Sequence, residues 1–126
     1  MEFAELEKMV SVVDDDSVGE FLAKNELVII VAGALWCSDT KRMIYKSLPI
    51  LCEKYQGKVS FAMCMIEGET SGITDCPKFK KTYQVERYPT IIVFRNGQAT
   101  KFIISEKSAE GQMTDMEELI SEVINS

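Results

Sequence analysis

The chain has 126 residues, 46% of them apolar, which is enough for the core of one ordinary domain. Its formal net charge is −6, and an acidic chain without a basic stripe is a poor partner for nucleic acid. It contains no histidine, so the commonest general base and the commonest zinc ligand are both missing. We expect no metal site, and any acid–base step must use other side chains or water.

The four cysteines stand at positions 37, 52, 64 and 76. They form no Cys-x-x-Cys pair, which argues against a zinc ribbon or a dithiol motif, and free thiols fit a reducing environment. The first residues are acidic and lack the apolar stretch of a signal peptide. The longest apolar run is too short to span a bilayer. We therefore expect a soluble, cytoplasmic monomer with no membrane partner.

The first half of the chain alternates between predicted helices and strands. A short helical or frayed lead-in (1–9) precedes a strand (9–13) and a helix (18–25), which the polar residues 14–17 can cap. A fully apolar strand (27–34) follows, and then a long amphipathic helix (38–55) that Pro49 should kink. The next apolar strand (59–66) completes an order of elements that predicts parallel neighbouring strands joined by right-handed crossovers.

The second half is predicted to end in a hairpin and a helix. Residues 67–75 form a polar loop, and Pro77 suits the first position of a short helix. Asn96-Gly97 is a strong hairpin signal, so strands 90–95 and 99–104 should pair antiparallel. After a loop at 105–113, Thr114 and Glu117 make a capping box for the last helix. The prediction is a single α/β domain over residues 1–126, with a mixed sheet of about five strands and about four flanking helices.

The apolar strand delivers Trp36 and Cys37 directly to the start of the long helix. The unpaired amides of a first helical turn and the helix dipole both favour an anion there. The thiolate is the nucleophilic form of cysteine, so this position is typical of a redox or nucleophilic thiol. The alternative is a cysteine that merely packs at the end of a strand.

Three segments together resemble the thioredoxin family over nearly the full chain: Trp36-Cys37, residues 53–59 (EKYQGKV) and residues 88–97 (YPTIIVFRNG). The resemblance implies a thioredoxin fold in which Pro89 follows a cis peptide bond; the alternative is a trans proline at a strand edge. It also implies a groove that docks an extended partner beside the thiol, with Trp36 either contacting partners or simply packing. The candidate binding residues are Trp36, Ser38, Asp39, Tyr88, Pro89 and Thr90.

The motif Cys37-Ser38-Asp39-Thr40 departs from the Cys-x-x-Cys of thioredoxins. The first thiol can still form a mixed disulfide, but the nearby sulfur that would release it is missing. The Thr40 hydroxyl is a candidate catalytic group that donates to the Cys37 thiolate; equally, it is a tolerated small polar residue. Asp39 stands where the family usually has proline, and its charge should oppose thiolate formation against the helix N-terminus.

Two further departures concern residues that the resemblance assigns to proton transfer. Val31 occupies the place of the family's buried aspartate, five residues before the tryptophan, and Met63 aligns with its companion lysine. In the family, that pair acts when the second cysteine reacts. The dithiol half of the mechanism is therefore missing as a unit.

The remaining cysteines are predicted to differ in role. Cys52 lies several helical turns from Cys37 and Cys64 lies in an apolar strand, so both are read as core residues. Cys76 follows the loop that leaves strand 59–66 at the sheet edge holding Cys37, and it precedes a helix. Cys76 is therefore a candidate resolving thiol; the alternative is a capping or packing cysteine.

Two functions of different classes follow from these residues. The first is thiol–disulfide exchange through Cys37 alone, with protein disulfides or thiols as clients, glutathione as an external thiol and no bound cofactor. The loop at 67–76 would then flank the groove. The second is a non-catalytic adaptor that binds a protein in the same groove. A weaker alternative is an iron–sulfur protein bridged by Cys37 and glutathione.

Overall fold

The computed structural model describes residues 2–67, 76–104 and 107–125. Helices and strands alternate along most of the chain, as the sequence predicts. The helices are α1 (Phe3–Leu6), α2 (Val18–Lys24), α3 (Ser38–Arg42), the π-helical turn η1 (Met43–Ser47), α4 (Leu48–Lys54), α5 (Pro77–Tyr83) and α6 (Ala109–Asn125). The strands are β1 (Ser11–Val12), β2 (Leu27–Ala34), β3 (Ser60–Glu67), β4 (Thr90–Arg95) and β5 (Gln98–Ile103).

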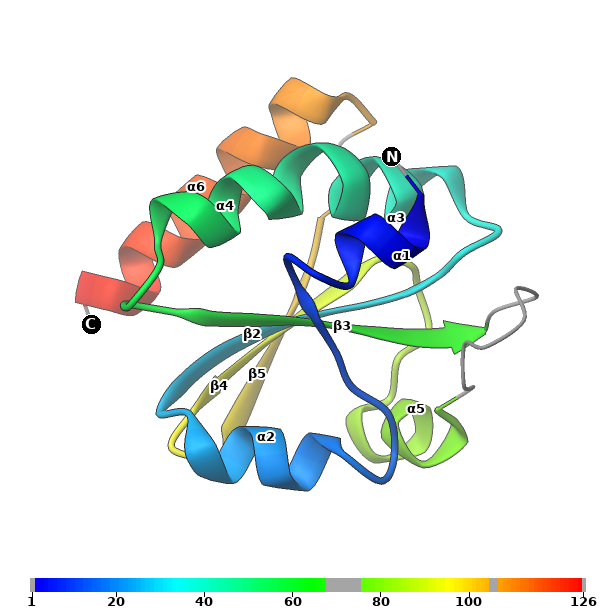
Figure 1. Cartoon of the computed structure of the whole chain (residues 1–126), viewed down its shortest axis with the longest axis vertical. Helices are drawn as coiled ribbons and strands as arrows, with labels where there is room; N and C mark the ends of the chain where they lie inside the picture. Colours follow the sequence, from blue (N-terminus) through cyan, green and yellow to red (C-terminus); the bar gives the residue numbers. More distant parts are fainter. Residues whose placement is uncertain (1, 68–75, 105–106, 126) are drawn as a thin grey trace.

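The strands form one mixed sheet in the order β1-β3-β2-β4-β5. β3 runs parallel to β1 and β2, whereas β4 runs antiparallel to β2 and β5. Figure 1 shows α1, α3, α4 and α6 over one face of this sheet and α2 and α5 over the other. The predicted mixed five-stranded α/β architecture is confirmed. There are more helical segments than the predicted four, because α1 is formed and the long helix divides.

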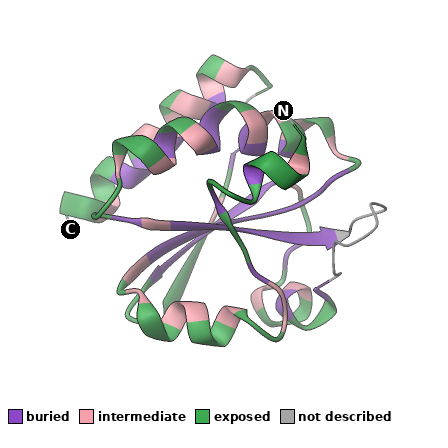
Figure 2. Ribbon diagram, viewed as in Figure 1, coloured by how far each residue is buried: buried purple, intermediate pink, exposed green. Residues whose placement is uncertain are grey.

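The core lies in two layers, one on each face of the sheet (Figure 2). Side chains alternate along a strand, so Ile29 and Val31 of β2 face the layer under α4 and α6. Val28 and Ile30 face the opposite layer, which α5 helps to close. β2 reads as a continuous apolar run because helices cover both of its faces.

The long helix predicted over 38–55 is present but is interrupted before Pro49. Proline has no amide hydrogen, so an α-helical bond from residue 49 to the carbonyl of residue 45 cannot form. The chain widens into the π-helical turn η1 just before it, where the Leu48 amide donates to the carbonyl of Met43. Pro49 then occupies the first turn of α4, where a missing donor costs little.

The last helix begins earlier than its predicted capping box. α6 starts at Ala109, and the Ser108 Oγ accepts a hydrogen bond from the Gly111 amide at 2.9 Å. Thr114 and Glu117 lie inside the helix, so the prediction of a loop through residue 113 is wrong. A lone serine three residues before the amide that it caps is a weaker sequence signal than a capping box, yet Ser108 sets the start of this helix.

The predicted loop at 67–75 lies outside the described residues except for Glu67, which ends β3. In the part of the chain that is described, no helix is both long enough and apolar enough to cross a membrane.

Candidate functional site

Cys37 stands where β2 gives way to α3. It occupies the N-cap of α3 in an extended conformation, with φ −88° and ψ 121°. Its backbone is held on both sides, since its amide donates to the carbonyl of Ala34 and its own carbonyl accepts from the Lys41 amide, each at 3.0 Å. The side chain is partly exposed, and its thiol donates to the carbonyl oxygen of Tyr88 at 3.8 Å. The strand–helix junction therefore presents one accessible sulfur.

The carbonyl that meets this sulfur belongs to the segment before β4. The Tyr88–Pro89 peptide bond is cis, the geometry that the family resemblance implies. Pro89 and Thr90 are buried, and the Thr90 hydroxyl donates to the carbonyl of Arg87 at 2.6 Å. Their side chains therefore shape the backbone of this segment, while Tyr88 contributes an accessible ring.

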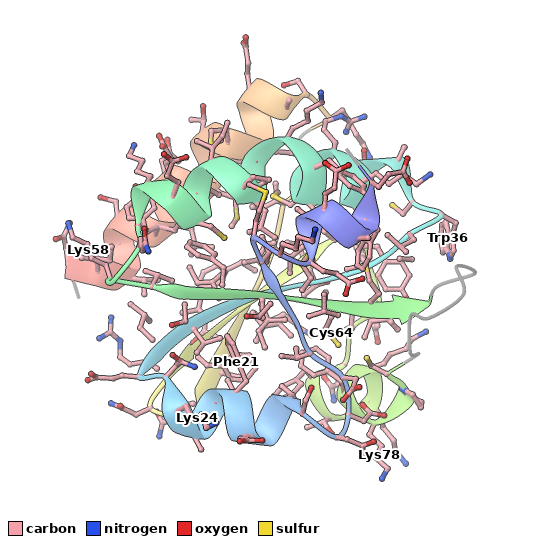
Figure 3. All side chains as sticks on the ribbon, in the orientation of Figure 1. Phe21, Lys24, Trp36, Lys58, Cys64 and Lys78 are labelled. Atoms are coloured by element: carbon pink, nitrogen blue, oxygen red, sulfur yellow. The ribbon has the colours of Figure 1, made fainter. Side chains whose placement is uncertain are left out.

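Two aromatic rings border the thiol. Trp36 is 56% exposed, and its ring meets the Tyr88 ring edge-on, with the centroids 5.8 Å apart and the planes at 78°. Lys80 lies on the Tyr88 ring, with its Nζ 5.9 Å from the centroid. Figure 3 shows Trp36 at the rim of the molecule, beyond the end of β2. The pair offers an exposed apolar surface next to Cys37.

Thr40 turns toward the strand rather than toward the thiol. It is fully buried, and its Oγ1 accepts a hydrogen bond from the Ala34 amide at 3.4 Å. It packs against Gly33, where an added Cβ would lie 2.4 Å from the Thr40 Cγ2. Among the described residues, no hydrogen bond between Thr40 and the Cys37 thiol is found. The structure thus gives Thr40 a role in joining β2 to α3.

Asp39 carries a charge that two cations balance. Its carboxylate binds the Arg42 Nη1 at 2.8 Å and the Lys107 Nζ at 2.5 Å. The hydrogen bond from Lys107, then that from Arg42, lowers the pKa of Asp39 below its ordinary value. The backbone carbonyl of Asp39 also accepts from the buried Gln112 Nε2 at 3.1 Å. The negative charge next to Cys37 is therefore largely compensated, and Ser38 between them is exposed.

Lys107 and Gln112 are site residues that the sequence reasoning missed. Lys107 precedes α6 and Gln112 lies near the start of that helix, so both are far from the motif in the chain. Local patterns carry no information on which distant side chain meets Asp39. Residues 105–113 are predicted to form a loop, so the burial of Gln112 is seen only in the folded chain.

Cys76 lies in the core layer that α5 helps to close. It is fully buried, its thiol donates to the Val13 carbonyl at 3.9 Å, and it hydrogen-bonds the Cys64 thiol. The structure therefore pairs Cys76 with Cys64, and not with Cys37 as the resolving-thiol hypothesis requires. Cys52 packs against the core with partial exposure, and burial raises its pKa to about 11. The loop at 67–76, which is expected to flank the groove beside Cys37, lies largely outside the described residues.

Val31 and Met63 are direct neighbours across the parallel β2–β3 pair. Both are fully buried in the same core layer. The two positions that the resemblance assigns to a carboxylate and an ammonium group thus form an apolar contact. In the described ranges, no group of three or more His, Cys, Asp or Glu residues is placed to hold a metal ion.

The sequence matches the Thioredoxin family model over residues 9–122. Thioredoxin from Mycobacterium bovis is 22% identical over 112 residues, which cover 88% of this chain and 89% of that protein. A chloroplastic M-type thioredoxin from Triticum aestivum is 29% identical over 77 residues, or 61% of this chain and 39% of that protein. The bifunctional thioredoxin reductase/thioredoxin of Mycobacterium leprae is 22% identical over 111 residues, and the match spans 22% of its length and 88% of this chain.

Solved structures agree with the observed fold. Oxidized mitochondrial thioredoxin 3 from Saccharomyces cerevisiae superposes with a TM-score of 0.71 at 22% identity, covering 93% of this chain and 98% of that one. A poplar thioredoxin h superposes with a TM-score of 0.74 at 17% identity, covering 94% and 98%. With the family model spanning most of the sequence, this chain belongs to the thioredoxin family.

Proposed function

We propose that this protein performs thiol–disulfide exchange through one nucleophilic cysteine, Cys37. The observation that carries the proposal is a partly exposed Cys37 thiol beside the Tyr88 carbonyl, in a motif whose fourth position holds the buried Thr40. Membership of the thioredoxin family supports thiol–disulfide redox chemistry in general. The proposal adds that Cys37 performs this chemistry without a second cysteine in its motif.

The exchange proceeds in two steps. The Cys37 sulfur attacks one sulfur of a client disulfide, so a new S–S bond joins Cys37 to the client. The client's own S–S bond breaks, and the second client sulfur leaves as a thiolate that takes up a proton. An external thiol then attacks the mixed disulfide at the client sulfur, and Cys37 leaves as a thiolate. Cys37 is therefore regenerated, one client sulfur is released as a thiol, and the other ends in a mixed disulfide with the external thiol.

Glutathione is the external thiol that we propose, in a reducing, cytoplasmic setting. One solved neighbour (TM-score 0.71, 21% identity, 91% of this chain and 96% of that one) concerns resolution of a yeast mitochondrial 1-Cys peroxiredoxin by glutathione and thioredoxin systems. That description applies to the yeast protein, and it supports glutathione as the first reductant to test here.

The groove beside Cys37 is suited to a client chain in an extended conformation. The backbone at Tyr88 already receives the Cys37 thiol, and it can bond a client backbone as an added strand does. The exposed Trp36 and the Tyr88 ring give apolar contact area on one side. We propose that Ser38 and Asp39 border the same groove, with Pro89 and Thr90 fixing its backbone.

Glutathione disulfide tests the proposal with intact-protein mass spectrometry. Wild-type protein should gain one glutathione on Cys37, and the Cys37→Ser variant should gain none at the motif. Cys52→Ser is the matched control, because burial raises the pKa of Cys52 to about 11 and keeps its thiol protonated. Insulin disulfide reduction should be slow. A Cys37 that stays unmodified while the protein is folded would overturn the proposal.

A non-catalytic adaptor is the second candidate, and the apolar Val31–Met63 contact favours it. At these two positions the family resemblance implies an aspartate and a lysine that transfer protons, and this chain has two apolar residues instead. Pull-downs from a lysate under non-reducing conditions separate the two candidates. Partners that are captured covalently and lost in Cys37→Ser support exchange, whereas equal capture by both proteins supports the adaptor.

A further inference from the structure

The layer between the sheet and α5 holds a second pair of thiols. Cys64 lies in β3, where it pairs with Ala32 of β2 and points into the layer that α5 closes (Figure 3). Cys76 is the N-cap residue of α5. Both side chains are fully buried, and neither cysteine is in a disulfide. Two elements distant in the chain thus bring two reduced sulfurs into one buried place.

The contacts around this pair hold the sulfurs together. The Cys64 and Cys76 thiols hydrogen-bond each other, and the Cys76 thiol also reaches the Val13 carbonyl at 3.9 Å. The Asp15 carboxylate accepts hydrogen bonds from the Lys78 amide at 3.0 Å and the Phe79 amide at 2.8 Å. These bonds fix the start of α5, and Cys76 with it, against the segment between β1 and α2.

The two sulfurs differ in reactivity because of that contact. The hydrogen bond from Cys64 lowers the pKa of Cys76, and the same bond raises the pKa of Cys64. Cys52 gives the contrast, since burial alone raises its pKa to about 11. The thiolate is the form that attacks an oxidant, so Cys76 is the nucleophile of the pair and Cys64 is its neighbour.

We propose that Cys64 and Cys76 form a redox centre separate from Cys37, which a small peroxide converts into a disulfide joining β3 to α5. The Cys76 sulfur attacks one peroxide oxygen, the O–O bond breaks, and the hydroxide that leaves takes up a proton to become water. The Cys64 sulfur then attacks the sulfur of the resulting sulfenic acid, an S–S bond forms, and a second water leaves. Two thiols lose two electrons, and one peroxide is reduced to two waters.

Because Cys64 and Cys76 are fully buried, only a small oxidant can reach their sulfurs. Hydrogen peroxide is little larger than water and can enter with a small opening of α5. Glutathione disulfide is far larger, so it is kept from both sulfurs and is left to react at the partly exposed Cys37. The two oxidants therefore distinguish the buried pair from the motif cysteine.

The Cys37→Ser/Cys52→Ser double variant tests the centre, because Cys64 and Cys76 are then the only cysteines in the chain. With hydrogen peroxide its mass should fall by two hydrogen atoms, and a digest without reductant should contain a peptide linking Cys64 to Cys76. With glutathione disulfide it should gain nothing. Adding Cys64→Ser, which keeps a hydrogen-bond donor beside Cys76, should leave a Cys76 sulfenic acid that dimedone labels. Cys64→Ala removes that donor and should be labelled less, and circular dichroism checks that both variants fold.

Three results would overturn the proposal. The first is a folded double variant that peroxide leaves unchanged, and the second is one that gains oxygen on separate, unlinked sulfurs. The third is an adduct of glutathione on either buried cysteine. Because the double variant lacks Cys37, each result is independent of the proposed exchange chemistry at the motif.

Discussion

Asp39 shows how one residue of the motif departs from its family and is accommodated. A carboxylate two positions after the thiol would oppose a thiolate, yet Arg42 and Lys107 both bind it. Arg42, in the next helical turn, and Lys107, in a distant segment, together balance the charge of Asp39. Position 39 is thereby an ion-paired link between α3 and the segment preceding α6.

The ion pairs at Asp39 predict a pH dependence of stability. Because the folded-state pKa of Asp39 is lowered below 3.8, its stabilising effect is full above that value and disappears as pH falls through the lower folded pKa. Wild type should therefore exceed Asp39→Asn in free energy of unfolding near neutral pH, and the gap should close as the pH falls below 3.8 and through the lower folded-state pKa. Urea denaturation at each pH measures this difference in free energy of unfolding.

The control is Asp16→Asn, at an exposed position, which should differ less from wild type. A difference between wild type and Asp39→Asn that stays constant with pH would contradict the account.

Gly33 and Thr40 make a second residue-level prediction. An added Cβ at Gly33 would lie 2.4 Å from the Thr40 Cγ2, so Gly33→Ala should destabilise the protein by about 1–3 kcal/mol. Thr40→Ala removes the two closest atoms and leaves the nearest contact at 3.0 Å. The double variant should thus be more stable than the sum of the single losses. Gly19→Ala, which adds a Cβ in open space within α2, should stabilise slightly; additive losses at 33 and 40 would contradict the clash.

At the scale of elements, α5 depends on a cap from outside its own sequence. No side chain at its N-cap position, Cys76, bonds the first-turn amides, and Asp15 accepts from two of them instead. Short helices have little intrinsic stability and rely on such contacts. The bonds to Asp15 therefore place α5 on the sheet.

Asp15→Ala should cost about 0.5–2 kcal/mol, the usual range for a lost helix cap. Hydrogen exchange should show faster exchange of the Lys78 and Phe79 amides, since both lose their acceptor. Asp16→Ala is the neighbouring control and should change stability by less than about 0.5 kcal/mol. Equal effects of the two substitutions would show that the cap is not what holds α5.

The element boundaries show where sequence patterns suffice. β2 matches its predicted range because eight apolar residues end at once in Trp36-Cys37. The Asn96-Gly97 turn likewise predicts the β4–β5 hairpin correctly. The start of α6 was misplaced, because Thr114 and Glu117 imitate a capping box while their actual place is inside the helix. There Glu117 binds Lys54 at 2.7 Å, a contact that only the folded chain creates.

For the whole molecule, the order of elements predicts the mixed sheet, and the family resemblance aligns Val31 with the family's buried aspartate and Met63 with its lysine. The structure then places these two residues in register and buries both. What the sequence could not predict are contacts between distant segments. Lys107 with Asp39, and Cys64 with Cys76, depend on how α6 and α5 are seated on the sheet. Spacing along the chain leaves such pairings open.

The arrangement separates two kinds of thiol. One partly exposed thiol, Cys37, stands at the end of β2 with a receptive carbonyl beside it. Two buried thiols, Cys64 and Cys76, face each other under α5. The central claim is that Cys37 acts without a partner thiol from its own chain.

The lifetime of a Cys37–glutathione mixed disulfide tests that claim most directly. The adduct is formed with glutathione disulfide, freed of excess reagent and followed by intact-protein mass spectrometry in the folded state. The account predicts that it persists until reduced glutathione is added and then returns to the free thiol. Spontaneous loss of glutathione, with a disulfide appearing between Cys37 and another cysteine of the same chain, would contradict it.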